Sequence, residues 1–264
     1  SKKVLLADAV APKANWGFSQ DLLGFSGAWS SRIAYTLQIY FDFSGYSDMA
    51  VGLGLMLGFQ FPQNFNSPYK SASITEFWRR WHISLSSWLR DYLYIPLGGN
   101  QKGPVRTYVN LFLTMLLGGL WHGASWTFML WGAYHGSLLA LERMNRKRGL
   151  GWGLPRPVQI ALTFVMVMFG WVLFRAPTME SFFRMAKGLA GMNGWGVVFP
   201  LEDAGALNWA MWMFCLALVF AAKNTWEIRW NPGWRLALGL AVLFIVCVAT
   251  FLVNTGSPFL YFQF

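Results

Sequence analysis

Charged residues are scarce in this sequence of 264 residues, where Asp, Glu, Lys and Arg together account for 12%. Soluble domains carry about 25%, so the composition argues against a soluble protein. Several apolar runs approach the roughly 20 residues that a membrane-spanning helix needs. Open sheets leave unpaired edges in lipid, and these runs do not alternate as barrel strands do. The composition therefore predicts an all-α polytopic membrane protein.

Cysteine and histidine are also few. The two cysteines, Cys215 and Cys247, lie in apolar runs and form neither a disulfide framework nor a Cys-x-x-Cys pair. The three histidines, His82, His122 and His135, show no His-x-x-x-His spacing of the kind that intramembrane metal hydrolases use. We expect no metal site and no tightly bound cofactor, with the cysteines serving as small packing residues.

Acidic residues are outnumbered by basic ones, which gives a net charge of +10. In a soluble protein this charge would suggest nucleic acid, but the positive-inside rule explains it without a nucleic-acid partner. The segments 59–106, 143–156 and 223–235 carry fourteen Lys and Arg residues, against seven in 1–32, 175–206 and 254–264. The first group is therefore expected in the cytoplasm, and the C-terminus on the opposite side.

The apolar pattern predicts about six spanning or re-entrant helices and one amphipathic interfacial helix at 73–92. Residues 1–32 are expected to hold the end of a preceding element and a loop, and residues 59–72 and 175–206 to be loops. The chain opens with no signal peptide and not with Met, so we treat 1–264 as a single transmembrane domain, the C-terminal portion of a longer chain. The expected spans are 33–58, 107–121, 126–142, 158–174, 207–222 and 236–253.

His122 stands out because it lies between two long apolar runs, within the sequence GGLWHGASW at 118–126. A histidine in such surroundings is costly unless it is satisfied by a packing partner or used in function. The glycines before it allow close approach of the flanking helices. In the first span, Asp42 and Asp48 must be paired, protonated or turned to water, and we expect them to pair with arginines of the next segment.

The predicted helix at 73–92 begins with a capping box, Ser73 and Glu76. His82 lies on the flank of its apolar stripe. The arginines on its polar face, Arg79, Arg80 and Arg90, could bind a phosphate or could pair with neighbouring carboxylates. We expect His135 to be structural.

Five motifs resemble the membrane-bound O-acyltransferase family, in the branch that acts on bacterial polysaccharides. They are YFDFSGYSDMA at 40–50, NFNSPY at 64–69, EFWRRWHISLS at 76–86, RDYLYIPLGG at 90–99 and LWHGA at 120–124. The resemblance implies a partial fold of that family, with His122 at the position of the catalytic histidine and His82 at the second motif position. It also implies a multi-pass protein of the bacterial inner membrane, in which the charge count above predicts a periplasmic C-terminus.

The implied function is movement of an acetyl group across the inner membrane for O-acetylation of an exopolysaccharide such as alginate. The implied donor is a thioester, either acetyl-CoA or an acyl carrier. The implied partners are periplasmic polysaccharide acetyltransferase subunits of the same pathway, with membrane lipid around the protein. D-alanyl transfer to teichoic acid is the alternative within the class, and transport of an acyl donor without catalysis is the alternative outside it.

Acyl transfer from a thioester to a hydroxyl needs a base for the hydroxyl proton and a donor for the oxyanion. Burial favours neutral imidazole, so we expect His122 to be the base or an acyl relay. His82 is expected to orient substrate or to hold the donor from the cytoplasmic side. The remaining candidate substrate-binding residues are Trp81, Arg79, Arg80, Arg90, Asp48 and Trp121.

Overall fold

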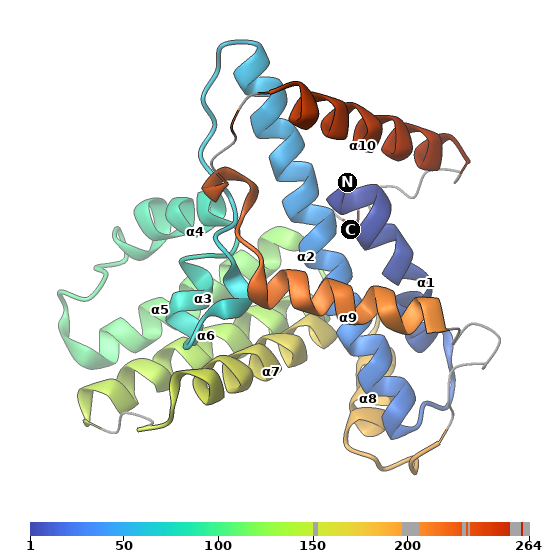
Figure 1. Ribbon diagram of the computed structural model, residues 1–264. Helices are drawn as coiled ribbons and strands as arrows, with labels where there is room; N and C mark the ends of the chain where they lie inside the picture. Colours follow the sequence, from blue (N-terminus) through green and yellow to red (C-terminus); the bar gives the residue numbers. More distant parts are fainter. Residues whose placement is uncertain (150–152, 197–205, 229–230, 232, 254–259, 261–264) are drawn as a thin grey trace. The chain divides into compact units, whose positions relative to one another are not determined.

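The computed structural model describes residues 1–149, 153–196, 206–228, 231, 233–253 and 260 (Figure 1). These residues form helices, turns and coil and contain no strand, which confirms the predicted all-α class. The chain divides into two compact units, one made of residues 1–63 and 194–264 and the other of residues 64–193. That a single domain covers 1–264 stays a prediction.

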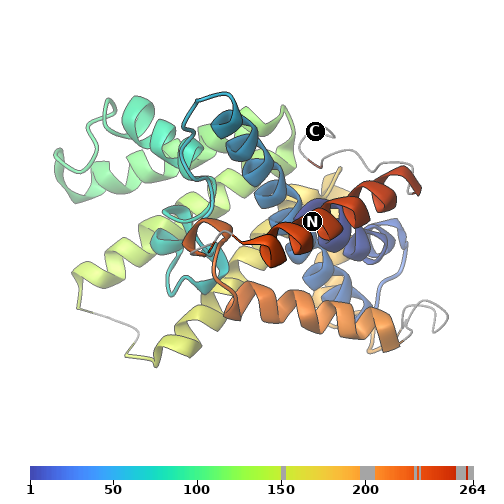
Figure 2. The same ribbon diagram turned by 45° about the horizontal axis from the view of Figure 1, so that its top comes forward.

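In the first unit, the described residues form six helical elements of at least three residues. Figures 1 and 2 show its last two long helices, α9 and α10, as separate rods joined through the short turn η5. The elements are η1 (Lys2–Ala7), α1 (Asp8–Ser19), α2 (Phe25–Met56), α9 (Ala206–Ala221), η5 (Thr225–Glu227) and α10 (Trp234–Val253).

The predicted loop within residues 1–32 is wrong, because α1 extends to Ser19 and α2 already begins at Phe25. Pro12 and Gly17 suggested breaks, since both weaken a helix. Both nevertheless lie inside α1, which packs along α2 and buries Val10 and Ala14 completely. Burial against a neighbouring helix thus outweighs the local preference.

The predicted pairing of the two aspartates with arginines is also wrong. Asp42 pairs with Lys3 and Asp48 with Lys2, each at 2.8 Å. Both lysines belong to η1, which lies so close to α2 that a Cβ on Gly45 would stand 3.0 Å from the backbone nitrogen of Lys3. Glycine on α2 therefore brings the ammonium groups within reach of the carboxylates.

Among the described residues, two helices are long and apolar enough to cross a membrane, α7 (Arg156–Arg175) and α10, and α9 contains a shorter apolar stretch, Ala210–Ala221. None of the residues of α10 is buried within the structure, although the helix is the more apolar of the two. Such a surface suits contact with lipid. The full count of about six spans stays a prediction, and the chain end 254–264, apart from Leu260, lies outside the described residues.

The second unit is built around α5 (Gly103–His122), α6 (Trp126–Lys147) and α7, with α6 packed against both of the others (Figure 1). The expected helices at 107–121, 126–142 and 158–174 are confirmed, each somewhat longer than predicted. A Cβ on Gly119 would overlap the carbonyl oxygen of Phe128, and one on Gly132 would overlap that of Met115. The glycines therefore do allow the close helix contact that the sequence predicts.

One further helix, α8 (Met179–Leu189), lies within the predicted loop 175–206, so that part of the prediction is wrong. Thr178 and Ser181 form a capping box at its start. The later part of that segment, 197–205, lies outside the described residues.

The predicted continuous helix at 73–92 is wrong as well, because the chain breaks it between Trp78 and Ile83. The segment instead forms α3 (Ile74–Trp78), α4 (Ile83–Leu89) and the π-helix η3 (Arg90–Tyr94), preceded by η2 (Pro68–Lys70). Backbone bonds to residues 64–66 replace helical bonds at the break: Asn66 N donates to Arg80 O at 2.9 Å, and Ile83 N donates to Asn64 O at 3.0 Å.

Of the two hydrogen bonds of the predicted capping box at residues 73–76, one is present. The Ser73 hydroxyl accepts a hydrogen bond from the backbone N–H of Glu76 at 3.1 Å and caps α3. The Glu76 carboxylate does not return to Ser73 but accepts from the backbone N–H of Ala72 at 2.8 Å. The apolar stripe is buried from Ile74 to Trp81, whereas Tyr92 is 70% exposed.

Candidate functional site

His122 is the last residue of α5 and lies among aromatic rings. Its imidazole is half-buried and stands 5.3 Å from Trp131, 5.0 Å from Phe174 and 6.1 Å from Phe128, measured between ring centroids. Trp121 lies 5.0 Å away on its other side and is 60% exposed. The α5–α6 joint and α7 thus surround this imidazole with apolar walls while leaving it partly accessible.

His82 lies in the break between α3 and α4, in the left-handed backbone conformation with φ of 45°. Its Nδ1 atom is 3.2 Å from Oδ1 of Asn64. The pKa of His82 is lowered from 6.5 to about 3, first by burial and then by the positive charge that a protonated His122 would place near it. The two histidines are therefore close enough to influence each other's protonation, although forty positions separate them.

His135, on α6, is completely buried. Its ring stands 5.2 Å from those of Trp78 and Trp131, and a Cβ on Gly170 of α7 would lie 2.5 Å from its Nε2 atom. This tight packing fits the structural role expected for His135. Trp131 contacts the rings of both His122 and His135.

Trp81 and Trp121, both candidate substrate-binding residues, lie in different surroundings. Trp81 is 3% exposed and stacks with Phe77 at 5.6 Å and with Tyr69 at 5.9 Å, and its ring lies 4.8 Å from that of Trp171. It is a core residue of the second unit. Of these two tryptophans, Trp121 is the one whose side chain is exposed beside a histidine.

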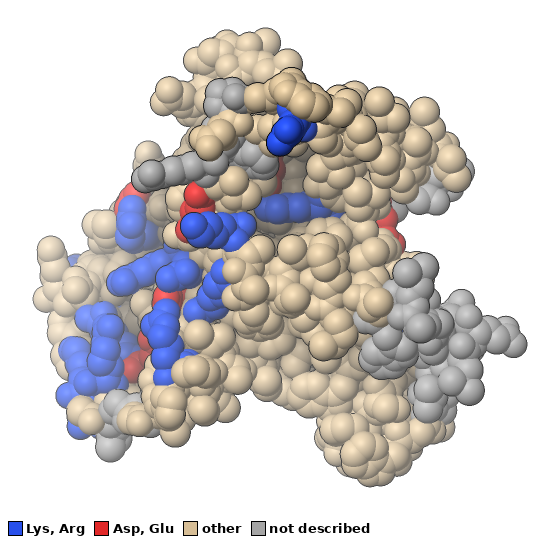
Figure 3. All heavy atoms as spheres, in the orientation of Figure 1, with Lys and Arg blue, Asp and Glu red and all other residues tan. Residues whose placement is uncertain are grey.

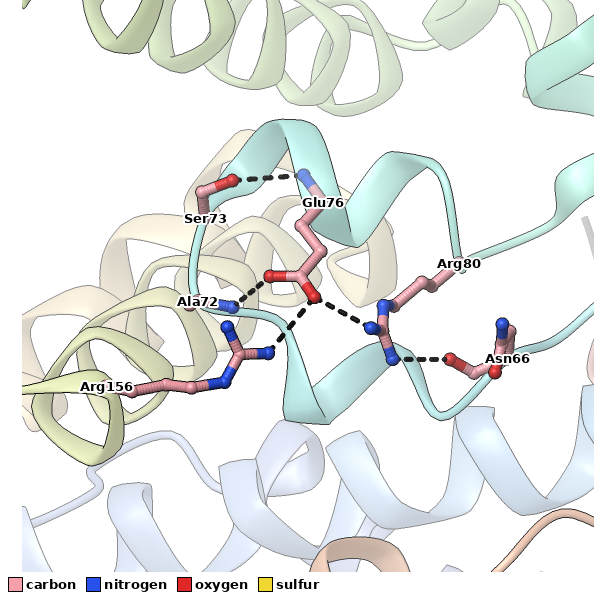
Figure 4. Close-up of polar contacts among 6 residues, drawn as sticks. All are labelled: Asn66, Ala72, Ser73, Glu76, Arg80 and Arg156. Carbon is pink, nitrogen blue, oxygen red and sulfur yellow. Dashed lines mark hydrogen bonds and ion pairs between the residues drawn. The ribbon is translucent and has the colours of Figure 1, made fainter. Parts of the chain in front are cut away.

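The arginines of the α3–α4 region are mostly paired. Figure 4 shows the Glu76 carboxylate between Arg80 and Arg156, with nitrogen–oxygen distances of 2.8 and 3.3 Å, and Arg80 also donates to the carbonyl of Asn66. Burial alone would raise the pKa of Glu76, but the Ala72 N–H and the two guanidinium groups hold that pKa below its usual value.

The other two arginines are at the surface. Arg90 pairs with Asp91 at 2.7 Å, and both side chains are exposed, as is Arg79. Of the two roles considered for these arginines, pairing with carboxylates is what the structure shows for Arg80 and Arg90. Asp48 belongs to the first unit, where it pairs with Lys2 and accepts a hydrogen bond from Thr225 at 2.8 Å.

Figure 3 shows Lys and Arg side chains gathered over the region of α3 to α7, with a few carboxylates among them. A cavity of about 740 Å³ lies in this unit, lined by the start of α3, the end of α6 and the beginning of α7, and it includes Glu142, Arg146 and Met166. None of the three histidines lines it. The cavity is therefore distinct from the region around His82 and His122.

Among the residues that the structure describes, no group of three or more His, Cys, Asp and Glu side chains could hold a metal ion. Cys215 and Cys247 are free thiols, the first of them buried. The burial of Cys215 fits the expected packing role, whereas Cys247 lies on α10, where no residue is buried.

The sequence did not identify three residues of this region as neighbours of the histidines: Asn64, Trp131 and Phe174. Trp131 precedes His135 by one helical turn and so shares its face of α6, which is a signal that the sequence does contain. The neighbours Asn64 and Phe174 come from segments far away in the sequence, and only the fold brings them to the histidines.

Comparisons with known proteins identify relatives of the whole chain. The chain is 45% identical to a probable alginate O-acetylase of Pseudomonas putida over 100% of this chain and 59% of that protein. It is 56% identical to one of Azotobacter vinelandii over 74% of this chain and 39% of that protein. The chain thus spans less than two thirds of the length of these relatives.

More distant relatives act on other polymers, by their names. A peptidoglycan O-acetyltransferase of Helicobacter pylori is 37% identical over 100% of this chain and 54% of its own length. A teichoic acid D-alanyltransferase of Bacillus subtilis is 35% identical over 53% of this chain and 39% of its own length. The family model described as membrane-bound O-acyltransferase matches residues 12–150, which include His82 and His122. The chain therefore belongs to the membrane-bound O-acyltransferase family.

Proposed function

We propose that this chain carries the histidine centre of a membrane-bound O-acetyltransferase that moves an acetyl group across the bacterial inner membrane for O-acetylation of an exopolysaccharide such as alginate. Family membership supports the reaction class, and the names of the most similar relatives support the acceptor. The observation that carries the proposal is one aromatic cluster that connects the two histidines. His122 contacts the rings of Trp131 and Phe174, and both of these contact Trp171. Trp171 in turn contacts Trp81, the residue directly before His82.

In this proposal His122 acts as the base. One imidazole nitrogen takes the proton of the acceptor hydroxyl as its oxygen attacks the carbonyl carbon of a thioester donor. The carbon–sulfur bond then breaks, and the leaving thiolate takes the proton from His122, so that neutral histidine and free thiol remain. The aromatic walls limit access of water, which would otherwise compete as an acceptor.

A relay is the second form of the same chemistry. Here the His122 nitrogen attacks the thioester carbonyl first and expels the thiol, and the acceptor hydroxyl then takes the acyl group from the imidazole. The two forms differ in a measurable intermediate, because only the relay leaves the acetyl group on the protein when the acceptor is withheld.

The donor is a thioester, acetyl-CoA or an acyl carrier, and the reaction needs no tightly bound cofactor or metal. Of the candidate phosphate-binding arginines, Arg79 is best placed to meet a donor phosphate, since Arg80 and Arg90 have carboxylate partners. The partners are periplasmic polysaccharide acetyltransferase subunits, which pass the acetyl group to the polymer.

The proposal includes a topology of about six spanning or re-entrant helices with a periplasmic C-terminus. The charge bias of the loops supports it. A C-terminal alkaline phosphatase fusion should be active and a C-terminal green fluorescent protein fusion should be dark. The opposite pattern would place the C-terminus in the cytoplasm.

The test is acetyl transfer by the full-length protein in proteoliposomes, with radiolabelled acetyl-CoA or acetylated carrier and a polysaccharide acceptor. His122→Ala and His122→Gln should each lower the rate by about 10²- to 10⁴-fold without loss of folded protein. Trp126→Phe is a matched control at the same joint, because Trp126 is 69% exposed, and its rate should be unchanged. Full activity of either His122 variant would refute the proposal. Passage of the donor without acylation would indicate a transporter.

D-alanyl transfer to teichoic acid is the second candidate, because the Bacillus subtilis relative with that name is 35% identical over 53% of this chain. Its identity is lower and covers about half of the chain, which favours acetyl transfer. Supplying D-alanyl carrier in place of the acetyl donor in the same proteoliposomes distinguishes the two.

A further inference from the structure

The side chain of Asn64 lies against His82 in an arrangement that fixes the orientation of its amide group. The backbone N–H of Ser84 points at one atom of that amide, 3.1 Å away. A backbone N–H can only donate a hydrogen bond, so the atom that faces it must be the oxygen Oδ1 and not the NH2 group. The Ser84 hydroxyl donates to the same oxygen at 3.0 Å.

The identity of that oxygen decides where the His82 ring carries its proton. Nδ1 of His82 is 3.2 Å from Oδ1 of Asn64. An amide oxygen has no proton to give, so the contact is favourable only if Nδ1 carries a hydrogen and donates it. Neutral imidazole holds one proton, so Nε2 then carries a lone pair and acts as a hydrogen-bond acceptor.

The other tautomer would need the Ser84 hydroxyl to donate to Nδ1. Those two atoms are 3.4 Å apart, longer than the 3.0 Å from the hydroxyl to Asn64. It would also bring the lone pair of Nδ1 against the lone pairs of Oδ1 at 3.2 Å, which is repulsive. The geometry therefore favours a proton on Nδ1.

The same segment holds the backbone on both sides of His82. Asn64 O accepts from the N–H of Ile83 at 3.0 Å, and Asn66 N donates to Arg80 O at 2.9 Å. The Arg80 side chain returns to the Asn66 carbonyl at 3.3 Å (Figure 4). These bonds support His82 in its left-handed conformation, so both the ring and the backbone of His82 depend on residues 64–66.

We propose that Asn64 is a positioning residue that fixes the proton of the neutral His82 ring on Nδ1, so that Nε2 of this form accepts a hydrogen bond and does not donate one. This rests on the proposed function in one respect, that His82 meets a reacting group. The group that meets Nε2 is then a hydrogen-bond donor, such as the acceptor hydroxyl, and not the thioester carbonyl oxygen. His82 cannot serve as an N–H donor to the oxyanion through Nε2, so it orients the acceptor rather than stabilising the tetrahedral intermediate.

The test reads the tautomer directly. In full-length protein with ¹⁵N-labelled histidine in nanodiscs, proton–nitrogen correlation spectra should show His82 with a protonated Nδ1 and a bare Nε2, with the signal assigned by its loss in His82→Gln. Asn64→Leu should abolish this preference and lower kcat by at least about tenfold with a smaller change in KM. Asn64→Asp should keep the tautomer and rescue kcat, with the acidic limb of its pH profile moved to higher pH, because a carboxylate favours protonated imidazole.

Ser84→Ala is the matched control. It removes a hydroxyl from the same oxygen but leaves the backbone N–H that orients the amide, so the tautomer should be unchanged. A bare Nδ1 in the wild type, or the same tautomer in Asn64→Leu, would overturn the proposal. If Asn64→Leu fails to fold, the wild-type spectrum still decides. A further outcome is the stated tautomer together with full acetyl transfer by His82→Gln. That result would refute the proposed role of His82 in acetyl transfer, but it would leave the role of Asn64 in fixing the His82 proton intact.

Discussion

At the scale of single residues, the conformation of His82 is the unusual feature of this chain. A left-handed conformation costs a non-glycine residue about 1 to 2 kcal/mol, and such strain gathers at functional sites. Among the described residues only His82 and Ser67 share it outside glycine. Both lie within or beside the motifs at 64–69 and 76–86, where hydrogen bonds to residues 64–66 offset the cost.

The lowered pKa of His82 predicts a pH dependence of stability. Between about pH 6.5 and 3 the unfolded chain binds a proton at His82 that the folded chain does not, so the stabilisation present above pH 6.5 is lost as the pH falls through this window. In His82→Gln this contribution is absent. Melting temperatures in detergent at pH 7.5 and 4.5 should therefore differ less for the variant than for the wild type. Equal differences would show that His82 titrates normally.

His135 predicts a second residue-scale result. Gly170→Ala places a methyl group 2.5 Å from Nε2 of His135, which has no room to move among Trp78 and Trp131. We expect a loss of about 1 to 3 kcal/mol, seen as a lower melting temperature. Gly52→Ala is the matched control on α2, where an added Cβ meets nothing within 4 Å, and it should be neutral or slightly stabilising. If Gly170→Ala left the melting temperature unchanged, as expected for Gly52→Ala, α6 and α7 would pack less tightly at Gly170 than the structure shows.

At the scale of helices, Glu76 links the start of α3 to Arg80 and to the start of α7. Glu76→Gln removes the charge that these contacts share and should lower the melting temperature at pH 7. Because the pKa of Glu76 is held below its usual value, the gap between wild type and variant should narrow as acid protonates the carboxylate. Asp91→Asn is the control, since its exposed pair with Arg90 should add little. A larger effect at Asp91 than at Glu76 would contradict this ranking.

The helices that the sequence predicted well are those whose apolar runs are continuous. The α5, α6 and α7 helices follow from their composition, and the closeness of α5 and α6 follows from Gly119 and Gly132. The break at His82 could not be predicted in this way, because it is stabilised by backbone bonds to residues 64–66 that local periodicity does not contain. The full length of α1 was missed, since burial against α2 outweighs the effect of Pro12.

In the candidate site, too, local motifs predicted some residues and the fold was needed for the others. His82 and His122 could be found because each lies in a distinctive local motif. The neighbours that shape their chemistry, Asn64 and Phe174, come from other segments and needed the fold. The aspartates of α2 show the same limit, since the sequence favoured arginine partners, whereas the fold supplies Lys2 and Lys3.

At the scale of the whole molecule, composition and family agree on a membrane protein. The apolar helix α10 buries none of its residues within this chain, and α7 is partly buried while still apolar enough to span. The chain covers 39% and 59% of the length of its two alginate relatives. Acetyl transfer is therefore a property to be measured on the full-length protein, with this chain supplying the two histidines.

The central claim is that His82 and His122 form one site, and a double-mutant cycle on acetyl transfer tests it most directly. If His122→Gln costs about 10³-fold and His82→Gln about 10²-fold, residues that act as a unit should give a double variant within about threefold of His122→Gln alone. Independent roles would instead multiply to about 10⁵-fold. The account predicts the first result, and full multiplication of the two losses would contradict it.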